Sequence, residues 1–83
     1  MKETFLEVFT DKLVNTCTVL TNHMDDYTRP REAVANHISR LRAFTELAHD
    51  IDIIDYSEYL ALEVVIDMVE EEADDLVEER ESV

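Results

Sequence analysis

The sequence predicts an all-α fold: a three-helix antiparallel bundle or a helical hairpin, with a long acidic C-terminal helix, that forms a dimer. Three observations predict it. The 83 residues include no glycine and one proline, apolar residues recur at spacings of three and four in three segments, and acids dominate the last third. Tight β-hairpins and phosphate-binding loops usually need glycine. We expect one domain over residues 1–83, with helices at about 3–24, 30–49 and 56–81.

The first two helices are predicted from their apolar faces. On the first, the face consists of Leu6, Phe9, Leu13, Cys17, Leu20 and Met24, with Phe5 and Val8 beside it. The segment that follows is rich in Asn and Asp, which compete with helix by bonding their own backbone. Pro30 then suits the first turn of the second helix. The face of that helix consists of Val34, His37, Leu41, Phe44, Ala48 and Ile51, flanked by Ile38 and Leu47.

The third helix is predicted to begin after Asp55, an N-cap that would form a capping box with Glu58. Its apolar stripe is the expected self-association surface and consists of Tyr59, Leu62, Ile66, Val69, Ala73 and Leu76. A helix of about 25 residues is about 38 Å long, longer than the other two. Its acidic end is therefore expected to overhang the core, to fray or to pack against a second subunit.

Charge is segregated along the chain. The net charge is −14, and residues 50–83 hold 14 of the 21 acidic residues. Four of the seven basic residues gather in the middle of the chain, at Arg29, Arg31, Arg40 and Arg42. A molecule this negative is repelled by nucleic acid and by anionic membranes, so neither is an expected direct partner. We expect the arginines to pair with acids of the third helix or of a neighbouring subunit.

A ridge of carboxylates runs along the third helix beside its apolar stripe. Its members are Asp67, Glu70, Glu71, Asp74, Asp75 and Glu78. Like charges three or four residues apart repel each other, and acids near a helix C-terminus oppose the macrodipole. A basic partner surface, such as the phosphate-binding groove of a nucleic-acid-binding protein, would offset these costs. The alternative is a solvated face that keeps the chain soluble.

Motifs for chemistry are few. Glu46 and His49 form a Glu-x-x-His pair, the spacing that helical di-iron proteins use, and Glu32 or Glu63 would have to complete a site in a dimer. The motif occurs once, so these residues are weak candidates and neither a metal nor another cofactor is expected. The sequence contains no pattern that indicates an activated nucleophile, so we do not expect the protein to be an enzyme. A lone Cys17, no export signal and no long apolar segment indicate a cytoplasmic protein.

The preferred function is that of a small acidic protein-binding module. It would act as an inhibitor or regulator whose third helix occupies a basic surface of a partner, such as a DNA- or RNA-binding protein. In character the chain resembles the small acidic inhibitors of phages and mobile elements, although no motif ties it to a named family. The alternative is a self-associating adaptor or accessory subunit whose acids serve solubility. A third and less favoured function is that of a dimer that binds a metal through Glu46 and His49.

Overall fold

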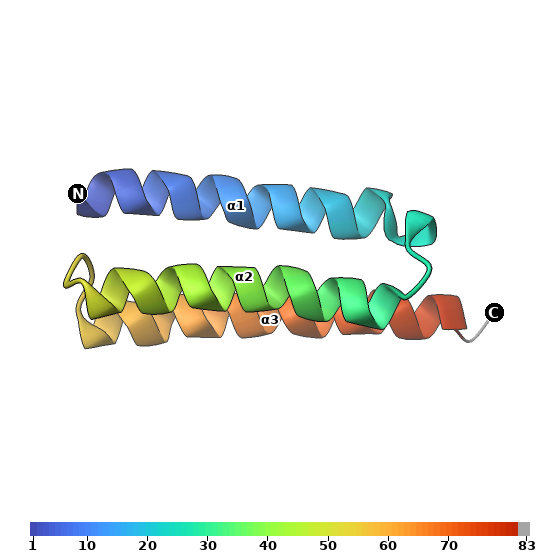
Figure 1. Cartoon of the computed structure of the whole chain (residues 1–83). Helices are drawn as coiled ribbons and strands as arrows, with labels where there is room; N and C mark the ends of the chain where they lie inside the picture. The colour runs from blue at the N-terminus through green and yellow to red at the C-terminus, as the bar shows by residue number, and fades with distance from the viewer. Residues whose placement is uncertain (82–83) are drawn as a thin grey trace.

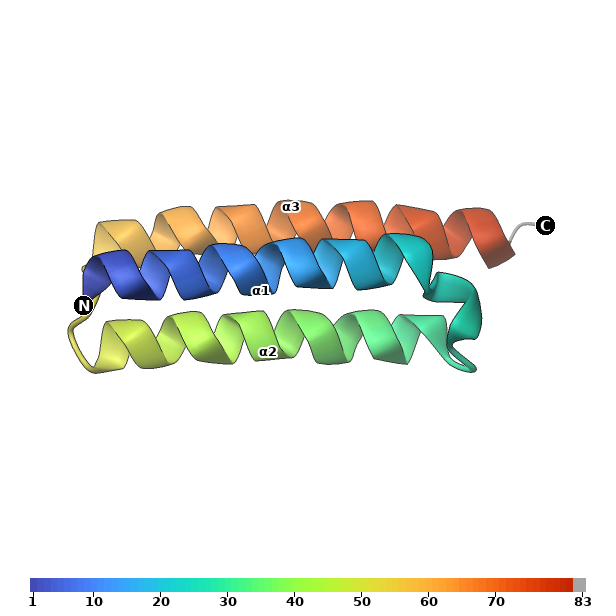
Figure 2. The ribbon, with the colours of Figure 1, turned by 90° about the horizontal axis from the view of Figure 1, so that it is seen from above.

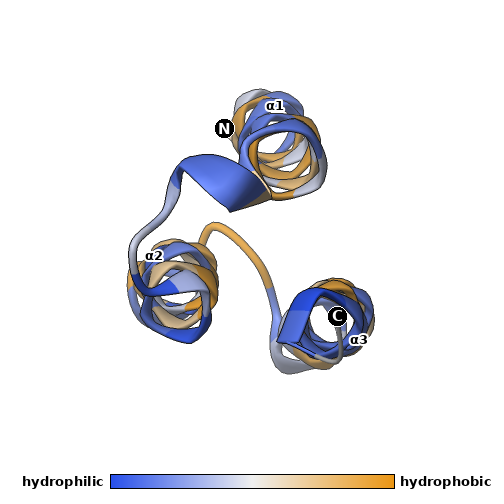
Figure 3. Ribbon diagram, turned by 90° about the vertical axis from the view of Figure 1, so that its right-hand side faces the viewer, coloured by the Kyte–Doolittle hydropathy of each residue, from blue (hydrophilic) through white to orange (hydrophobic). Residues whose placement is uncertain are grey.

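The computed structural model describes residues 1–81, and these contain three helices, a short 3₁₀ turn and no strand. The elements are α1 (Lys2–Asn22), η1 (Met24–Asp26), α2 (Pro30–Asp50) and α3 (Tyr56–Glu81). Successive helices run antiparallel along one axis (Figures 1 and 2). Seen along that axis, they lie at the corners of a triangle (Figure 3). The predicted all-α fold is confirmed, and it is a helical bundle.

One continuous core runs along the bundle, and it reaches further than expected. Ile66 and Val77 of α3 have no exposed surface, and Ala73 between them is buried. The acidic end of α3 was expected to overhang the core. This is wrong for the helix up to Val77, which still packs in the core. The physical reason is η1, whose Met24 is completely buried and extends the core past the end of α1.

The faces of α1 and α2 are rotated slightly from the predicted ones. On α1, Phe5 is buried and Leu6 is partly exposed; on α2, Thr45 is buried, and Ile51, directly after the helix, is exposed. Thr45 can occupy the core because its Oγ1 donates a hydrogen bond to the carbonyl oxygen of Leu41 at 2.9 Å. A buried hydroxyl that has such a partner is common in protein interiors.

The connection between α1 and α2 is built around η1. α1 ends at Asn22, two residues before the predicted end, and His23 Nδ1 then lies 3.0 Å from Asp26 Oδ2. Pro30 occupies the first turn of α2, as predicted, while Arg29 before it forms no side-chain cap. The buried Met24 therefore anchors this connection to the core, and Pro30 fixes the start of α2.

The joint between α2 and α3, residues 51–55, closes the opposite end of the core. Ile54 is buried there, and Asp52 has a φ of 62°, in the left-handed region that usually favours glycine. The predicted capping box is confirmed: the Asp55 N–H donates to Glu58 Oε1 at 3.1 Å, and the Glu58 N–H donates to Asp55 Oδ1 at 2.8 Å. In the described part of the chain, no helix has both the length and the apolar character needed to cross a membrane.

Candidate functional site

The apolar stripe of α3 faces the inside of the bundle. Ile66 and Ala73 are buried, and the other four residues pack against the same core: Tyr59, Leu62, Val69 and Leu76. Helices α1 and α2 of the same chain therefore cover the stripe predicted to drive self-association. A second copy would have to displace one of these helices to reach it, and self-association through this stripe stays a prediction.

On the side of α3 that faces α2, three carboxylates surround one arginine of α2. Arg42 Nη1 lies 2.7 Å from Glu63 Oε2, and Arg42 Nη2 lies 2.7 Å from Asp67 Oδ1 and 3.1 Å from Glu70 Oε1. The hydrogen bond with Asp67, together with the charges of all three carboxylates, raises the pKa of Arg42. The expected pairing of α2 arginines with α3 acids is thus confirmed for Arg42, whereas Arg29 pairs with Glu32 of its own helix and Arg40 forms no ion pair within residues 1–81. Two acids of the predicted partner-binding ridge, Asp67 and Glu70, are engaged within the chain.

A second arginine of α2 contacts the far end of α3. Arg31 donates to both carboxylate oxygens of Glu81, from Nε at 3.1 Å and from Nη2 at 2.9 Å. This hydrogen bonding, followed by the nearby charges of Glu78 and Asp74, raises the pKa of Arg31. Asp74 and Glu78 therefore lie in the field of a cation of their own chain.

The solvent-exposed side of α3, which we term its outer face, keeps exposed carboxylates over its second half. Five of them form no ion pair within residues 1–81. One is Asp74, which lies near Arg31. We term the other four the outer acidic face: Glu71, Glu72, Asp75 and Glu79. Those three or four residues apart hold like charges about 5–6 Å from each other. Glu71 and Asp75 belong to the predicted ridge. Glu72 and Glu79 were not predicted. Glu72 lies at the edge of α3 that meets α1, where it lines a small cavity with Cys17 and Leu76.

The same outer face is apolar over its first half. Leu60, Val64 and Met68 follow each other at intervals of four and are 46%, 58% and 59% exposed. We term these three residues the outer apolar row. Scattered exposed apolar side chains are normal on proteins, whereas contiguous ones mark contact surfaces. The outer face of α3 therefore joins an apolar half to an acidic half.

The weak metal candidates do not converge. Glu46 is exposed, while the ring of His49 packs beside Tyr56 and Tyr59, with centroids 6.0 and 5.1 Å away. Glu63, which would have to complete such a site, binds Arg42 instead. Among residues 1–81, no three His, Cys, Asp or Glu side chains are grouped so that they could hold a metal ion.

Cys17, on α1, is half-buried against α3. Burial raises the pKa of its thiol, and the nearby charge of Glu72 raises it further. Reactive cysteines need the opposite shift, because the thiolate is the nucleophile. Cys17 therefore has the surroundings of a packing residue.

Comparison with known proteins adds no family to this description. The chain matches no protein-family model, no curated protein and no solved structure.

Proposed function

We propose that the protein is a small acidic binding module, an inhibitor or regulator that places the outer acidic face on a basic surface of a partner protein. The division of charge on α3 supports this proposal. Asp67 and Glu70 are bound by Arg42. Within residues 1–81, no Lys or Arg side chain forms an ion pair with the outer acidic face. Each like-charge pair on a helix costs a few tenths of a kcal/mol. A basic partner would remove that cost.

The proposed partner is a DNA- or RNA-binding protein. Its nucleic-acid site presents Lys and Arg side chains that otherwise contact phosphates, and a helix offers them carboxylates at fixed spacing. The chain itself, with a net charge of −14, would not bind nucleic acid directly. We propose no catalytic role, and we place the protein in the cytoplasm, where a lone thiol such as Cys17 stays reduced.

Two variants with the same change of charge test the proposal. The outer-face variant replaces four acids with their amides, at Glu71, Glu72, Asp75 and Glu79. The control variant does the same to four exposed acids on α1 and α2, at Glu3, Glu7, Asp11 and Asp50. Each protein is immobilised and exposed to nuclease-treated lysate of the source cell at low salt.

The native and control proteins are expected to retain the same basic protein, and the outer-face variant is expected to lose it. Added nucleic acid should release the retained protein, because both compete for one surface. Equal retention by all three proteins would contradict the proposal, since the acids would then serve only solvation. Loss in the control variant as well would mean that net charge alone governs binding.

A second candidate, a self-associating adaptor or accessory subunit, is favoured by the outer apolar row. Two α3 helices that meet antiparallel at Val64 would bury their apolar halves and hold their acidic halves at opposite ends. A row this short buries a small area, so the association should depend on concentration. Sizing with light scattering should find a native dimer at high concentration and a Val64→Asp monomer. A native mass that stays monomeric at every concentration would remove this candidate.

A further inference from the structure

Basic residues are scarce in this chain, and five of the seven form ion pairs with carboxylates. The pairs are Lys2–Glu58, Arg29–Glu32, Arg31–Glu81, Arg42–Glu63 and Arg80–Asp25. The other two, Lys12 and Arg40, have no carboxylate partner among residues 1–81. In a molecule with 21 acidic residues, two cations without such a partner are unexpected, and they lie together.

Lys12 and Arg40 line the same cavity between α1 and α2. The cavity measures about 160 Å³, and its other lining residues are Asn15, Thr16, His37 and Leu41. Every one of these side chains except Leu41 can donate a hydrogen bond, and none is a carboxylate. The cavity is therefore a small concentration of donors and positive charge.

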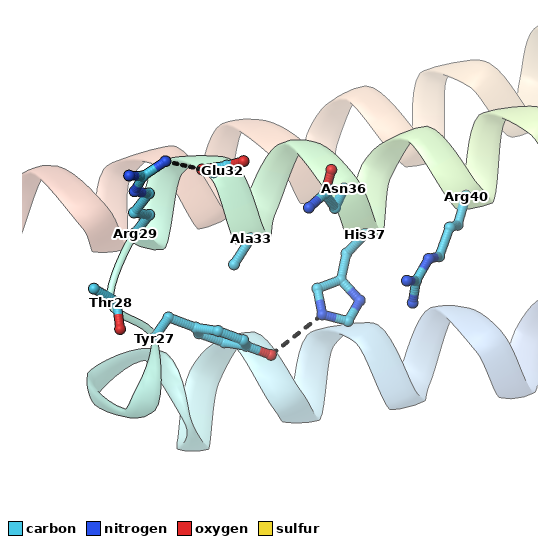
Figure 4. A pocket seen from close by; sticks show the side chains of 8 residues that line it. All are labelled: Tyr27, Thr28, Arg29, Glu32, Ala33, Asn36, His37 and Arg40. Carbon is cyan, nitrogen blue, oxygen red and sulfur yellow. Dashed lines mark hydrogen bonds and ion pairs between the residues drawn. The ribbon is translucent and has the colours of Figure 1, made fainter.

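A larger cavity, of about 390 Å³, adjoins the first and shares His37 and Arg40 with it. Figure 4 shows the side chains of His37 and Arg40 extending from α2 toward α1, while Tyr27 approaches His37 from the other side. The Tyr27 hydroxyl lies 3.2 Å from His37 Nε2. Together the two cavities form one open groove, which we term the α1–α2 groove.

The one neighbouring charge that acts on His37 is positive, unlike the net charge of the molecule. The carboxylate of Glu32, which also lines the larger cavity, is paired with Arg29. Burial lowers the pKa of His37, and the neighbouring Arg40 charge lowers it further. A nearby carboxylate would act in the opposite direction. Lys12 Nζ lies 5.2 Å from the centroid of the Phe44 ring. That contact holds the ammonium group in place without neutralising it.

We propose that the α1–α2 groove binds a phosphate group, free or as the monoester of a small organic molecule, between the Lys12 ammonium and the Arg40 guanidinium. Arginine offers paired donors that match phosphate oxygens, and lysine adds a compact charge. The smaller cavity has the volume of about five water molecules, which is enough for a phosphate group. The organic part of an ester would lie in the larger cavity beside Tyr27.

The test is an NMR titration of the amide resonances, in phosphate-free buffer at constant ionic strength, with inorganic phosphate and with adenosine monophosphate. The native protein should show saturable shifts around Lys12, His37 and Arg40, with a dissociation constant of about 1 mM or below. Lys12→Gln and Arg40→Gln should each weaken binding about ten-fold or more. Arg31→Gln removes the same charge outside the groove and should change affinity by less than about two-fold.

Each outcome decides the proposal. Equal affinity for both probes identifies the phosphate ion as sufficient, and tighter binding of the ester identifies the larger cavity as part of the site. No saturable shift with either probe overturns the site. So does an equal loss of affinity in Arg31→Gln, because overall charge would then govern binding. Circular dichroism checks that each variant folds, and Arg40→Lys, which keeps the charge but loses the paired donors, should give a partial loss.

Discussion

Replacing Arg42 with glutamine removes a cation that three carboxylates of α3 share. The side chains of Arg42 and Glu63 are 31% and 20% exposed, and a hydrogen bond between charged, partly buried groups contributes about 1.5–3 kcal/mol. Asp67 and Glu70 are more exposed, and each such pair contributes about 0.2–1 kcal/mol. Since interactions that share one group are not additive, we expect the free energy of unfolding to fall by about 2–4 kcal/mol.

Part of this loss comes from what the substitution leaves behind. The second carboxylate oxygen of Glu63 is buried and has no hydrogen-bond partner among residues 1–81. Without Arg42, this group would lose its cation and still be shielded from water. Glu63, Asp67 and Glu70 would also repel each other along one side of α3. A domain of this size has a free energy of unfolding of about 4–12 kcal/mol, so the melting temperature should fall by about 10–20 °C.

Urea unfolding followed by circular dichroism, in phosphate-free buffer, measures the effect. Arg40→Gln is the matched control, because it lies on the same helix, changes the charge equally and removes no ion pair; it should change stability by less than about 0.5 kcal/mol. Raising the salt to about 0.5 M should recover part of the loss in Arg42→Gln by screening the repulsion. If the two variants differed by less than about 1 kcal/mol in free energy of unfolding, the reasoning would be refuted. Ion pairs between exposed groups alone would then account for the loss.

Three further substitutions probe other parts of the fold. Ile66→Ala, at a completely buried position, should lower the free energy of unfolding by about 2–5 kcal/mol, and an unchanged urea midpoint would contradict the described core. Asp55→Ala removes half of the capping box and should cost about 1 kcal/mol; a thermal melt that matches the native one would show that the box is not needed. The pKa of His37 is lower in the folded chain than its ordinary value of 6.5, because of burial and of Arg40. As the pH falls, His37 therefore becomes protonated in the unfolded chain before it does so in the folded chain. Its contribution to stability is present above pH 6.5 and is lost as the pH falls through the pKa of His37 in the folded chain. The stability of the native protein relative to His37→Gln, which shares every other titrating group, should thus decrease from pH 7.5 to 5.5, and a constant difference would contradict the shift.

Features decided within a few residues were predicted correctly. The capping box at Asp55 and Glu58 and the start of α2 at Pro30 depend on local backbone chemistry alone. The rotation of each helix was predicted less well, because a spacing of three and four fits neighbouring faces almost equally. Packing of three helices decides that Phe5 is buried in place of Leu6. It also places Thr45, which no apolar pattern includes, in the core.

The candidate sites depend on how the helices are placed against one another. The sequence predicts that arginines of α2 meet acids of α3, but only the register of the two helices assigns Asp67 and Glu70 to Arg42. That same register leaves the outer acidic face exposed. The α1–α2 groove was not predicted at all. Lys12 and Arg40 belong to different helices, and no spacing along the chain relates them.

The three helices do not contact each other equally. α2 and α3 share the most extensive interface, and a joint of five residues, 51–55, connects them. Closing so short a loop costs little entropy, so we expect the α2–α3 hairpin to form first during folding and α1 to dock onto it afterwards. In native-state hydrogen exchange, amides of α1 should open at lower free energy than those around Ile66. The bundle would then open in a fixed order, with α1 leaving first and exposing Phe9 and Leu20 to water while the hairpin persists.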